Sequence, residues 1–228
     1  MALRTKLLLA VGAIVVVLVG AAALGWFVWA PSWRPTLEAG EVYGVDVSHH
    51  QGVVNWQDVH SDGIQFAYLK ATEGGDHVDG SFEANWEGAT AAGLDVGAYH
   101  FFTLCTTGRE QADNFLAELP EGGAGMPPAV DLEVGGNCAS RPPQWWLHQE
   151  LAVFLTTVSR STGQDVLLYV GDAFDDLYSV TGEFSEGLWQ RRILRRPDTN
   201  RWVVWQASYF AAVNGIDGRV DLDVRRGG

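Results

Sequence analysis

Two carboxylates separated by one residue are the groups in this chain best suited to acid–base chemistry. They are Asp131 and Glu133, in the short apolar segment 128–134 (PAVDLEV). Because a strand turns successive side chains to opposite faces, the two acids share one face. Burying both is costly, and their mutual repulsion raises the pKa of one, which gives a proton donor beside an anion. This is the minimal equipment for cleaving a glycosidic bond.

Strand-like and helix-like segments alternate over residues 42–224. Strands are predicted at 43–47, 65–71, 96–102, 129–134 and 166–170, where short apolar runs are bounded by Gly, Asp, Pro or Asn. Between them apolar residues recur at helical spacing, most clearly over 147–158. After residue 170 the helical pattern weakens, and strands are predicted at 188–194, 202–206 and 219–224. Eight strands with about five helices predict an α/β fold, a small and irregular TIM-like (β/α) barrel.

In such a barrel the chemistry collects where the strands end, at their carboxyl termini. Polar and aromatic residues end most of the predicted strands: Asp46, Lys70, Glu73, Tyr99, His100, Asp131, Glu133, Tyr169, Trp205, Gln206 and Asp221. Acids that converge with aromatic rings are typical of a carbohydrate site, because rings stack on sugar faces. Asp223 follows Asp221 by two residues, so the pattern alone leaves open which of them faces the site.

Six short motifs occur in order along the chain: GVDVS at 44–48, KATEG at 70–74, GAYHF at 97–101, DLE at 131–133, WQ at 205–206 and VDL at 220–222. Together they resemble glycoside hydrolase family 25, the lysozymes or N-acetylmuramidases of the Chalaropsis type. The resemblance spans residues 42–224. It implies a β/α barrel that hydrolyses the β-1,4 bond between N-acetylmuramic acid and N-acetylglucosamine in peptidoglycan, with retention of configuration.

The resemblance also implies roles for single residues. Glu133 is expected to be the general acid. Asp131 is expected to be the adjacent anion, which acts as nucleophile, stabilises the oxocarbenium ion or orients the substrate acetamido group. The family's other two site acids correspond to Asp46 and Asp221. Substrate contacts are expected from Tyr99, Lys70, Glu73, Tyr169, Trp205 and Gln206.

The sixth strand departs from the family pattern LWxAxY, since this chain reads LWQRRIL at 188–194. The arginines at 191, 192, 195 and 196 are predicted to form a solvated face, with contact to peptide carboxylates of the wall as the alternative. Two other functions stay open at this stage. One is a catalytically silent peptidoglycan-binding module, and the other is a hydrolase of another N-acetylated glycan such as chitin.

The N-terminus carries an uncharged apolar segment at residues 7–30, long enough to cross a bilayer. Arg4 and Lys6 precede it, so residues 1–6 are expected in the cytoplasm. We predict an uncleaved signal anchor in the bacterial inner (cytoplasmic) membrane, a linker at 31–41, a catalytic domain at 42–224 in the periplasm or extracytoplasmic space, and a tail at 225–228. The alternative is a signal peptide cleaved near residues 21–23 (AAA), which would make the protein secreted.

The net charge indicates which classes of partner this chain can bind, and the two cysteines indicate a disulfide. The formal net charge is −13, and all 28 Asp and Glu residues follow the apolar segment. This argues against nucleic acid as a partner and favours glycan strands of peptidoglycan, while protein partners are not predicted. An exported domain meets an oxidising compartment, so Cys105 and Cys138 are predicted to form a disulfide rather than two free thiols. Neither the His nor the Cys spacing predicts a metal site, and no cofactor is expected.

Overall fold

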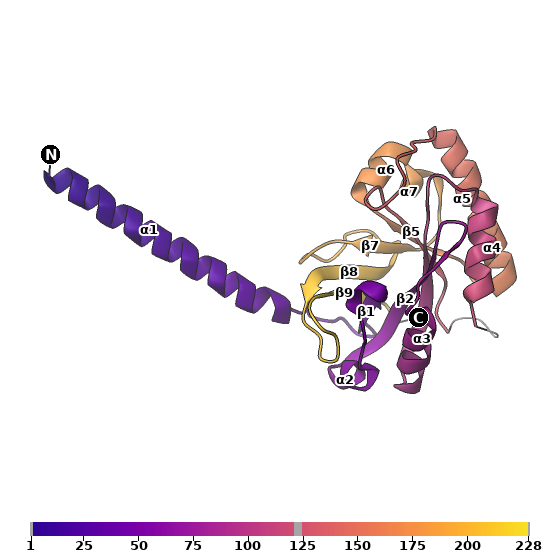
Figure 1. The fold of residues 1–228 in the computed structure, drawn as a ribbon, viewed down its shortest axis with the longest axis horizontal. Helices are drawn as coiled ribbons and strands as arrows, with labels where there is room; N and C mark the ends of the chain where they lie inside the picture. The colour runs from indigo at the N-terminus through magenta and orange to yellow at the C-terminus, as the bar shows by residue number, and fades with distance from the viewer. Residues whose placement is uncertain (1, 121–124, 228) are drawn as a thin grey trace.

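The computed structural model describes residues 2–120 and 125–227. A long helix, α1 (Ala2–Trp29), projects from a β/α barrel that holds the rest of the described chain (Figure 1). Among the described residues, only the helical stretch around Val11–Ser32 is long and apolar enough to cross a membrane by length and composition. Met1, the first residue of the predicted cytoplasmic segment, and Gly228, the last residue of the predicted tail, lie outside the described residues.

Eight strands close into a barrel, which confirms the predicted fold class. In chain order they are β1 (Val42–Val47), β2 (Ile64–Glu73), β4 (Asp95–Phe101), β5 (Ala129–Leu132), β6 (Leu167–Val170), β7 (Leu188–Arg191), β8 (Trp202–Ala211) and β9 (Val220–Arg225). The spatial order is β1-β9-β8-β7-β6-β5-β4-β2, and pairing of β1 with β2 completes the ring. Pairing is parallel from β1 through β2 and β4 to β8, whereas β9 runs antiparallel to both β8 and β1. The two-residue strand β3 (His77–Val78) extends β2 at the edge.

Alternate residues of the strands fill the inside of the barrel. Phe66 and Tyr68 of β2 lie there with Ala129, Leu167, Trp189 and Val204 in one apolar cluster. Gly44 and Gly97 leave room for the β2 rings, since a Cβ on Gly44 would lie 2.3 Å from Phe66 and one on Gly97 would lie 2.5 Å from Tyr68. Large side chains of β2 therefore fill the lower level of the barrel interior. Polar groups occupy the upper level, at the carboxyl ends of the parallel strands.

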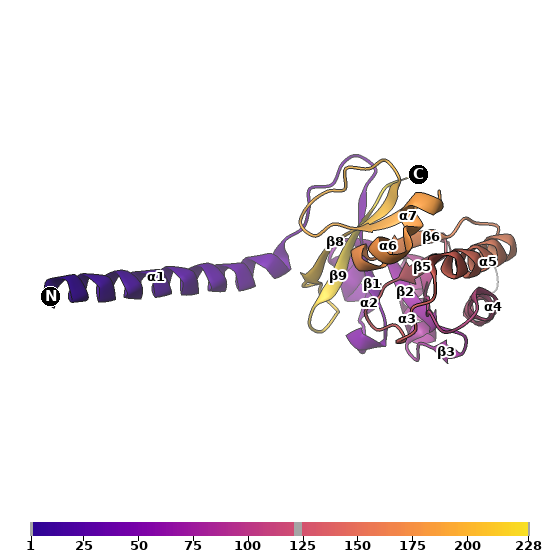
Figure 2. The same ribbon diagram turned by 90° about the horizontal axis from the view of Figure 1, so that it is seen from above.

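Helices cover the outer faces of the parallel strands. They are α2 (Trp56–Ser61), α3 (Phe82–Ala91), α4 (Gly108–Glu118), α5 (Gln144–Thr162), α6 (Asp172–Tyr178) and α7 (Val180–Glu183), with single 3-10 turns η1 (Ala30–Ser32) and η2 (His49–Gln51). A capping box of Thr107 and Glu110 begins α4, and Gly163 in the left-handed conformation ends α5. Figures 1 and 2 show α4 and α5 on the side of the barrel away from α1.

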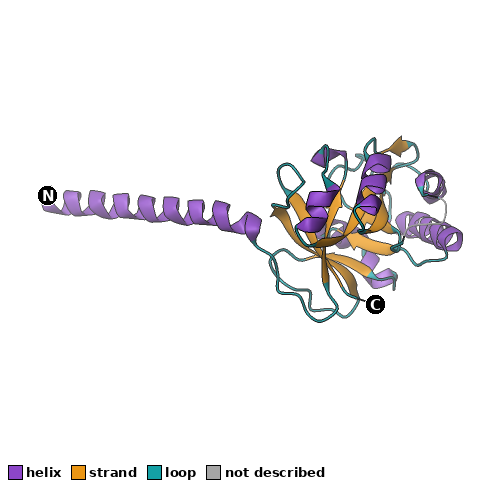
Figure 3. Cartoon of the chain, turned by 90° about the horizontal axis from the view of Figure 1, so that it is seen from below, coloured by secondary structure: helices purple, strands orange, loops and turns teal. Residues whose placement is uncertain are grey.

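Among the described residues, no α-helix is packed along the wall formed by β8 and β9, and the segment 33–41 covers part of it. In Figure 3 the chain leaves α1 as a loop that passes over these strands. Trp33 and Leu37 pack against Trp202 and Trp205. The Tyr43 hydroxyl donates a 2.5 Å hydrogen bond to the carbonyl of Pro35. We call residues 31–41 the strap, because the predicted linker is packed on the barrel along this wall.

The described chain also contains the predicted disulfide. Cys105 and Cys138 are bonded, with 6.4 Å between their Cα atoms. They join the loop after β4 to the loop after β5. Asn137 fastens the same two loops, since its amide donates to the carbonyls of Phe102 and Glu133 and its oxygen accepts from the Leu104 N–H. The loop that follows the two predicted catalytic carboxylates is therefore held at several points.

Candidate active site

A pocket of about 200 Å³ opens at the carboxyl ends of the strands. All four predicted catalytic acids line it, and they come from β1, β5, the residue after β5, and β9. The full lining is Asp46, Val47, Ser48, His50, Gln51, Tyr99, Asp131, Glu133, Tyr169, Trp189, Gln206 and Asp221. Residues that are up to 175 positions apart in the sequence meet there because the barrel brings every strand end to one mouth.

The strand β5 places the two central carboxylates at different depths. Asp131 lies within the strand, and Glu133 follows its last residue, Leu132. Both are partly accessible, but Glu133 also lines a second and larger groove of about 620 Å³. Gly171 gives Glu133 its space, since a Cβ at that glycine would lie 3.4 Å from the Glu133 side chain. Glu133 is therefore the carboxylate at the boundary between the pocket and the groove.

Three further acids stand on the facing strands β1 and β9. Asp46 is the cross-strand partner of Asp221, and Asp223 lies beneath them, fully buried. Gln206 Nε2 donates to Asp46 Oδ2 at 3.3 Å, and the Tyr169 hydroxyl donates to Gln206 Oε1 at 3.0 Å. Trp189 Nε1 donates to Asp223 Oδ1 at 3.0 Å. Both Asp221 and Asp223 thus face the barrel interior, with Asp221 at the pocket and Asp223 one level below.

Burial shifts the protonation of this whole set of acids. Desolvation is the largest cause in each case and raises the pKa of Asp46 and Asp131 well above the usual range for an aspartate. The pKa of Asp221 and that of Asp223 are each raised to about 8, with neighbouring carboxylates as the second cause. Asp46 is the cross-strand partner of Asp221, and the charge of each raises the pKa of a neighbouring acid on β1 or β9.

Glu133 forms an ion pair with an arginine at the edge of the groove. Burial raises its pKa, whereas the guanidinium of Arg191, with Nη1 3.7 Å from Glu133 Oε1, lowers it. In Asp131, one carboxylate oxygen lacks a hydrogen-bond partner. Its Oδ1 is buried and has no hydrogen-bond partner among residues 2–120 and 125–227. An unpartnered buried acceptor is costly, so this oxygen is suited to accept a hydrogen bond from a bound substrate.

The predicted substrate-binding residues divide into two groups. Tyr99, Tyr169 and Gln206 line the pocket. Trp205 does not line the pocket, because neighbouring residues of a strand point to opposite faces and Gln206 takes the inner one; its contact with substrate stays a prediction. The Trp205 ring packs outside the barrel with Trp202 and the strap.

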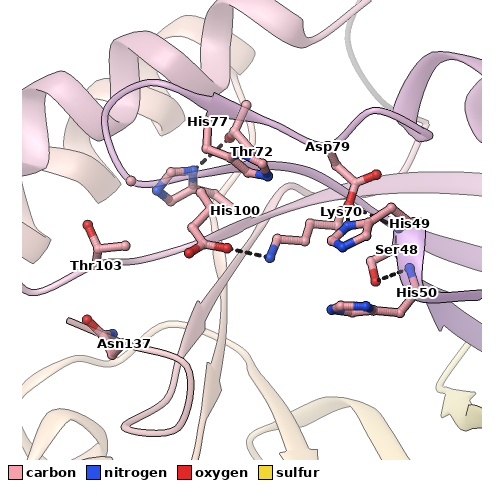
Figure 4. A network of polar contacts seen from close by, with 12 residues as sticks. Ser48, His49, His50, Lys70, Thr72, His77, Asp79, His100, Thr103 and Asn137 are labelled. Atoms are coloured by element: carbon pink, nitrogen blue, oxygen red, sulfur yellow. Dashed lines mark hydrogen bonds and ion pairs between the residues drawn. The ribbon is translucent and has the colours of Figure 1, made fainter.

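Lys70 and Glu73 form an ion pair at 2.7 Å and do not line the pocket (Figure 4). The ammonium of Lys70 lies 5.0 Å from the centre of the Phe101 ring and lowers the pKa of Asp131. These two residues stand next to the site, and their contact with substrate stays a prediction.

Sequence reasoning did not assign Trp189 or His50 to the site, and it left open whether Asp221 or Asp223 faces it. Trp189 packs 4.6 Å from the Tyr68 ring and bonds Asp223, so it connects the apolar interior to the acids. The signal was present, since Trp189 lies two residues before Arg191 on the inner face of β7. His50 lines the pocket through η2, and its ring lies 4.0 Å from that of His49.

The remaining histidines near the mouth are structural. His49 Nδ1 bonds the buried carboxylate of Asp79 at 2.7 Å. His100 is fully buried, with Nδ1 2.7 Å from Thr72 Oγ1, as Figure 4 shows. Burial lowers the pKa of His100 to about 3, so it is neutral and part of the core. Within the described residues, no group of three or more His, Cys, Asp or Glu side chains is arranged to hold a metal ion.

Comparison with known proteins gives a consistent result. The profile described as "Glycosyl hydrolases family 25" matches residues 45–216. The protein YegX of Escherichia coli (strain K12) is 34% identical over 195 residues, which cover 82% of this chain and 70% of that protein. Lysozyme M1 of Streptomyces globisporus is 30% identical over 209 residues, 79% of this chain and 66% of that protein. The structure of a family 25 glycosyl hydrolase from Bacillus anthracis superposes with a TM-score of 0.74 at 29% identity, over 86% of this chain and 93% of that one.

Proposed function

Because this chain belongs to glycosyl hydrolase family 25, we propose that it is a peptidoglycan muramidase with Glu133 as its general acid. The muramidase cleaves the β-1,4 bond between N-acetylmuramic acid and N-acetylglucosamine. The observation that carries the proposal is the position of Glu133, which lies beside Asp131 at the boundary of the acidic pocket and the groove. The lysozyme name of the Streptomyces globisporus relative supports the same substrate.

The geometry gives each acid a step in the hydrolysis. Glu133, protonated through burial, donates its proton to the glycosidic oxygen, and the bond from that oxygen to C1 breaks. Positive charge develops on the sugar ring in the pocket, where Asp131 and its neighbouring acids stabilise it. A water oxygen then bonds to C1, and its proton returns to Glu133. The net change is the addition of one water molecule across the bond.

The unpartnered Oδ1 of Asp131 supports a second part of this mechanism. It is placed to accept a hydrogen bond from the acetamido N–H of the sugar in the pocket, which orients that group toward C1. Tyr99 and Trp189 form aromatic walls of the same pocket, and aromatic faces suit sugar rings.

The muramidase is anchored in the cytoplasmic membrane by α1, with the barrel on the outer side. Two features support the anchor over a cleaved signal. The helix is 28 residues long, and its last turns carry Trp26 and Trp29, where an interfacial aromatic belt belongs. In addition, the Ala212 N–H donates a 2.8 Å hydrogen bond to the carbonyl of Pro31, directly after this helix, so the barrel is fastened to its end.

The test is product analysis after the full chain acts on purified peptidoglycan. The fragments are reduced with borohydride, and the new reducing-end sugar is identified by mass spectrometry. Reduced N-acetylmuramic acid is the expected product, and chitin oligomers are expected to remain intact. A reducing end of N-acetylglucosamine, or faster turnover of chitin, would contradict the proposed bond specificity. Binding without any cleavage would indicate a silent binding module.

A further inference from the structure

The groove of about 620 Å³ beside Glu133 has a different character from the acidic pocket. Arginines line one side of it, at positions 191, 192, 195 and 196, and Glu133, Gly171 and Phe174 are among the residues that complete it. Beyond residue 30 the chain has thirteen Lys and Arg residues against 28 Asp and Glu. Four of the thirteen therefore lie within one six-residue segment. Glu133, Asp172 and Asp198 also line the groove, so the four arginines leave it with a small excess of positive charge in an otherwise acidic domain, which favours anions there.

We call the segment 191–196 the arginine turn. Its backbone is hydrogen-bonded to the barrel strand β8. The Arg192 N–H donates to the carbonyl of Gln206, and the Leu194 N–H donates to that of Ala207. Trp205 Nε1 donates to the Arg192 carbonyl at 2.7 Å. Leu194 has φ of 59°, a left-handed conformation that a non-glycine residue adopts only when its surroundings impose it. The backbone of the turn is therefore held in one conformation, which fixes the points from which the arginine side chains extend.

Two of the four guanidinium groups face partly buried carboxylates. Arg196 forms ion pairs with Glu41, donates to the Thr36 carbonyl and packs on the Trp205 ring. Arg191 faces Glu133.

The other two guanidinium groups are available to a ligand. Arg192 is exposed and has no ion pair among the described residues. Arg195 meets only Asp198, at 3.6 Å, and both of these side chains are about three-quarters exposed. An exposed pair of this kind contributes little, so Arg195 can exchange its partner.

The position of Glu133 tells which part of a glycan strand reaches this groove. The general acid protonates the oxygen between the sugar that becomes positively charged and the sugar that leaves. The acidic pocket suits the positively charged sugar, so the leaving sugar lies on the other side of Glu133, in the groove. In peptidoglycan the next sugar along is an N-acetylmuramic acid, which carries a peptide with free carboxylates. Arginine binds carboxylates through two parallel hydrogen bonds.

We propose that Arg192 and Arg195 bind a peptide carboxylate on the leaving-group side of the glycan strand, which makes this muramidase selective for peptide-bearing strands. The inference rests on the proposed function, because it assumes that Glu133 protonates a bond in peptidoglycan. The arginines at 191–192, where the chain departs from the family pattern, would thus serve to select the substrate. Trp205 and Leu194 are positioning residues for the two arginines.

The test compares three substrates made from one wall preparation that has been freed of phosphate-containing polymers. They are intact strands, strands stripped of peptide by an amidase, and strands whose peptide carboxylates have been converted to amides. The full chain is compared with the double variant Arg192→Gln/Arg195→Gln. The matched control is Arg109→Gln/Arg160→Gln, which removes the same charge from the surface of α4 and α5. Circular dichroism verifies that each variant is folded.

The wild-type chain is expected to prefer intact strands over both modified substrates by about tenfold in kcat/KM. In the Arg192/Arg195 variant this ratio falls toward one through a higher KM, and the control keeps it. An unchanged ratio in the variant, or equal turnover of amidated and intact strands by the wild type, would overturn the inference alone. If none of the three substrates is cleaved, the muramidase proposal fails and this inference fails with it.

Discussion

Five carboxyl groups meet at the mouth of this barrel, and burial raises the pKa of each before any neighbour acts on it. They are Asp46, Asp131, Glu133, Asp221 and Asp223. Raised pKa values let carboxyl groups retain protons at higher pH than free acids do, which suits a reaction whose first step is proton donation. Within the cluster, Arg191 lowers the pKa of Glu133 as the second cause of its shift and that of Asp221 as a smaller one, so this arginine acts on the acid that the reaction uses.

Replacing Arg191 by Gln is expected to raise the pKa of Glu133 further, because the lowering effect of the cation is lost. A general acid must be protonated, so activity falls as pH rises through its pKa. The alkaline limb of the kcat/KM profile therefore moves to higher pH, by a few tenths of a unit for a partly exposed pair. Arg109→Gln serves as the control. If the limb stays in place or moves to lower pH in Arg191→Gln, the ion pair between Arg191 and Glu133 does not lower the pKa of the general acid.

Period-two alternation on strands explains both the success and the limits of prediction at this scale. It placed Asp131 and Glu133 on one face, and the barrel topology then brought Asp46 and Asp221 opposite them. The same alternation excludes Trp205 from the pocket once Gln206 faces inward, yet the motif Trp-Gln does not state which residue does so. Asp223 was undecidable from sequence, because strand depth depends on where β9 begins relative to the mouth.

At the scale of elements, the position of the polar groups in the upper level of the barrel interior depends on how the apolar side chains pack in the lower level. Phe66 and Tyr68 occupy the interior opposite Gly44 and Gly97, and no side chain larger than hydrogen fits at either glycine without movement. The strand β1 therefore combines a glycine that accepts a ring with Asp46, two residues later, at the pocket.

Gly44→Ala is expected to destabilise the fold by about 1–3 kcal/mol, since its Cβ would meet the Phe66 ring. Urea unfolding measures the loss. Gly80→Ala is the matched control, because a Cβ there meets nothing within 4 Å. Adding Phe66→Leu to Gly44→Ala is expected to restore part of the stability. Equal effects of the two Gly→Ala changes would contradict this packing account.

All eight barrel strands were predictable as elements because each has an apolar run bounded by turn residues. The helices α3, α4 and α5 were predictable because they repeat their apolar residues over two turns or more. By contrast, α2, α6 and α7 are seven residues or shorter, too short for a periodic pattern to show. The strap was predicted as a plain linker, since Trp33 and Leu37 have no regular spacing and only the bare wall of β8 and β9 gives them a partner.

At the scale of the whole molecule, the strap couples the apolar helix to the catalytic barrel. It covers Trp202 and Trp205, and its Glu41 binds Arg196 of the arginine turn. The ring of Trp26 lies 6.2 Å from that of Phe210, near the carboxyl end of β8. The helix α1 therefore joins the barrel close to its mouth, through a segment with little slack.

Removing the strap is expected to weaken the barrel, whereas removing α1 alone is not. The chain 42–228 loses the packing of Trp33 and Leu37, so its Tm is expected to fall by about 10 °C relative to the chain 31–228. Calorimetry of both chains measures this difference. Trp33→Ala with Leu37→Ala in the longer chain is expected to reproduce most of the loss. Equal Tm values for 31–228 and 42–228 would show that the strap is only a tether.

The most direct test of the central claim, that Glu133 donates the proton, compares two leaving groups. One substrate is the natural glycan strand, and the other is a muramic acid glycoside with an activated phenol that leaves without protonation. Glu133→Gln is expected to lose about 10²–10⁴-fold in kcat on the strand and much less on the phenol glycoside. Asp131→Asn is expected to lose activity on both. Equal losses of Glu133→Gln on the two substrates, or rescue of Asp131→Asn by the phenol, would contradict the assignment.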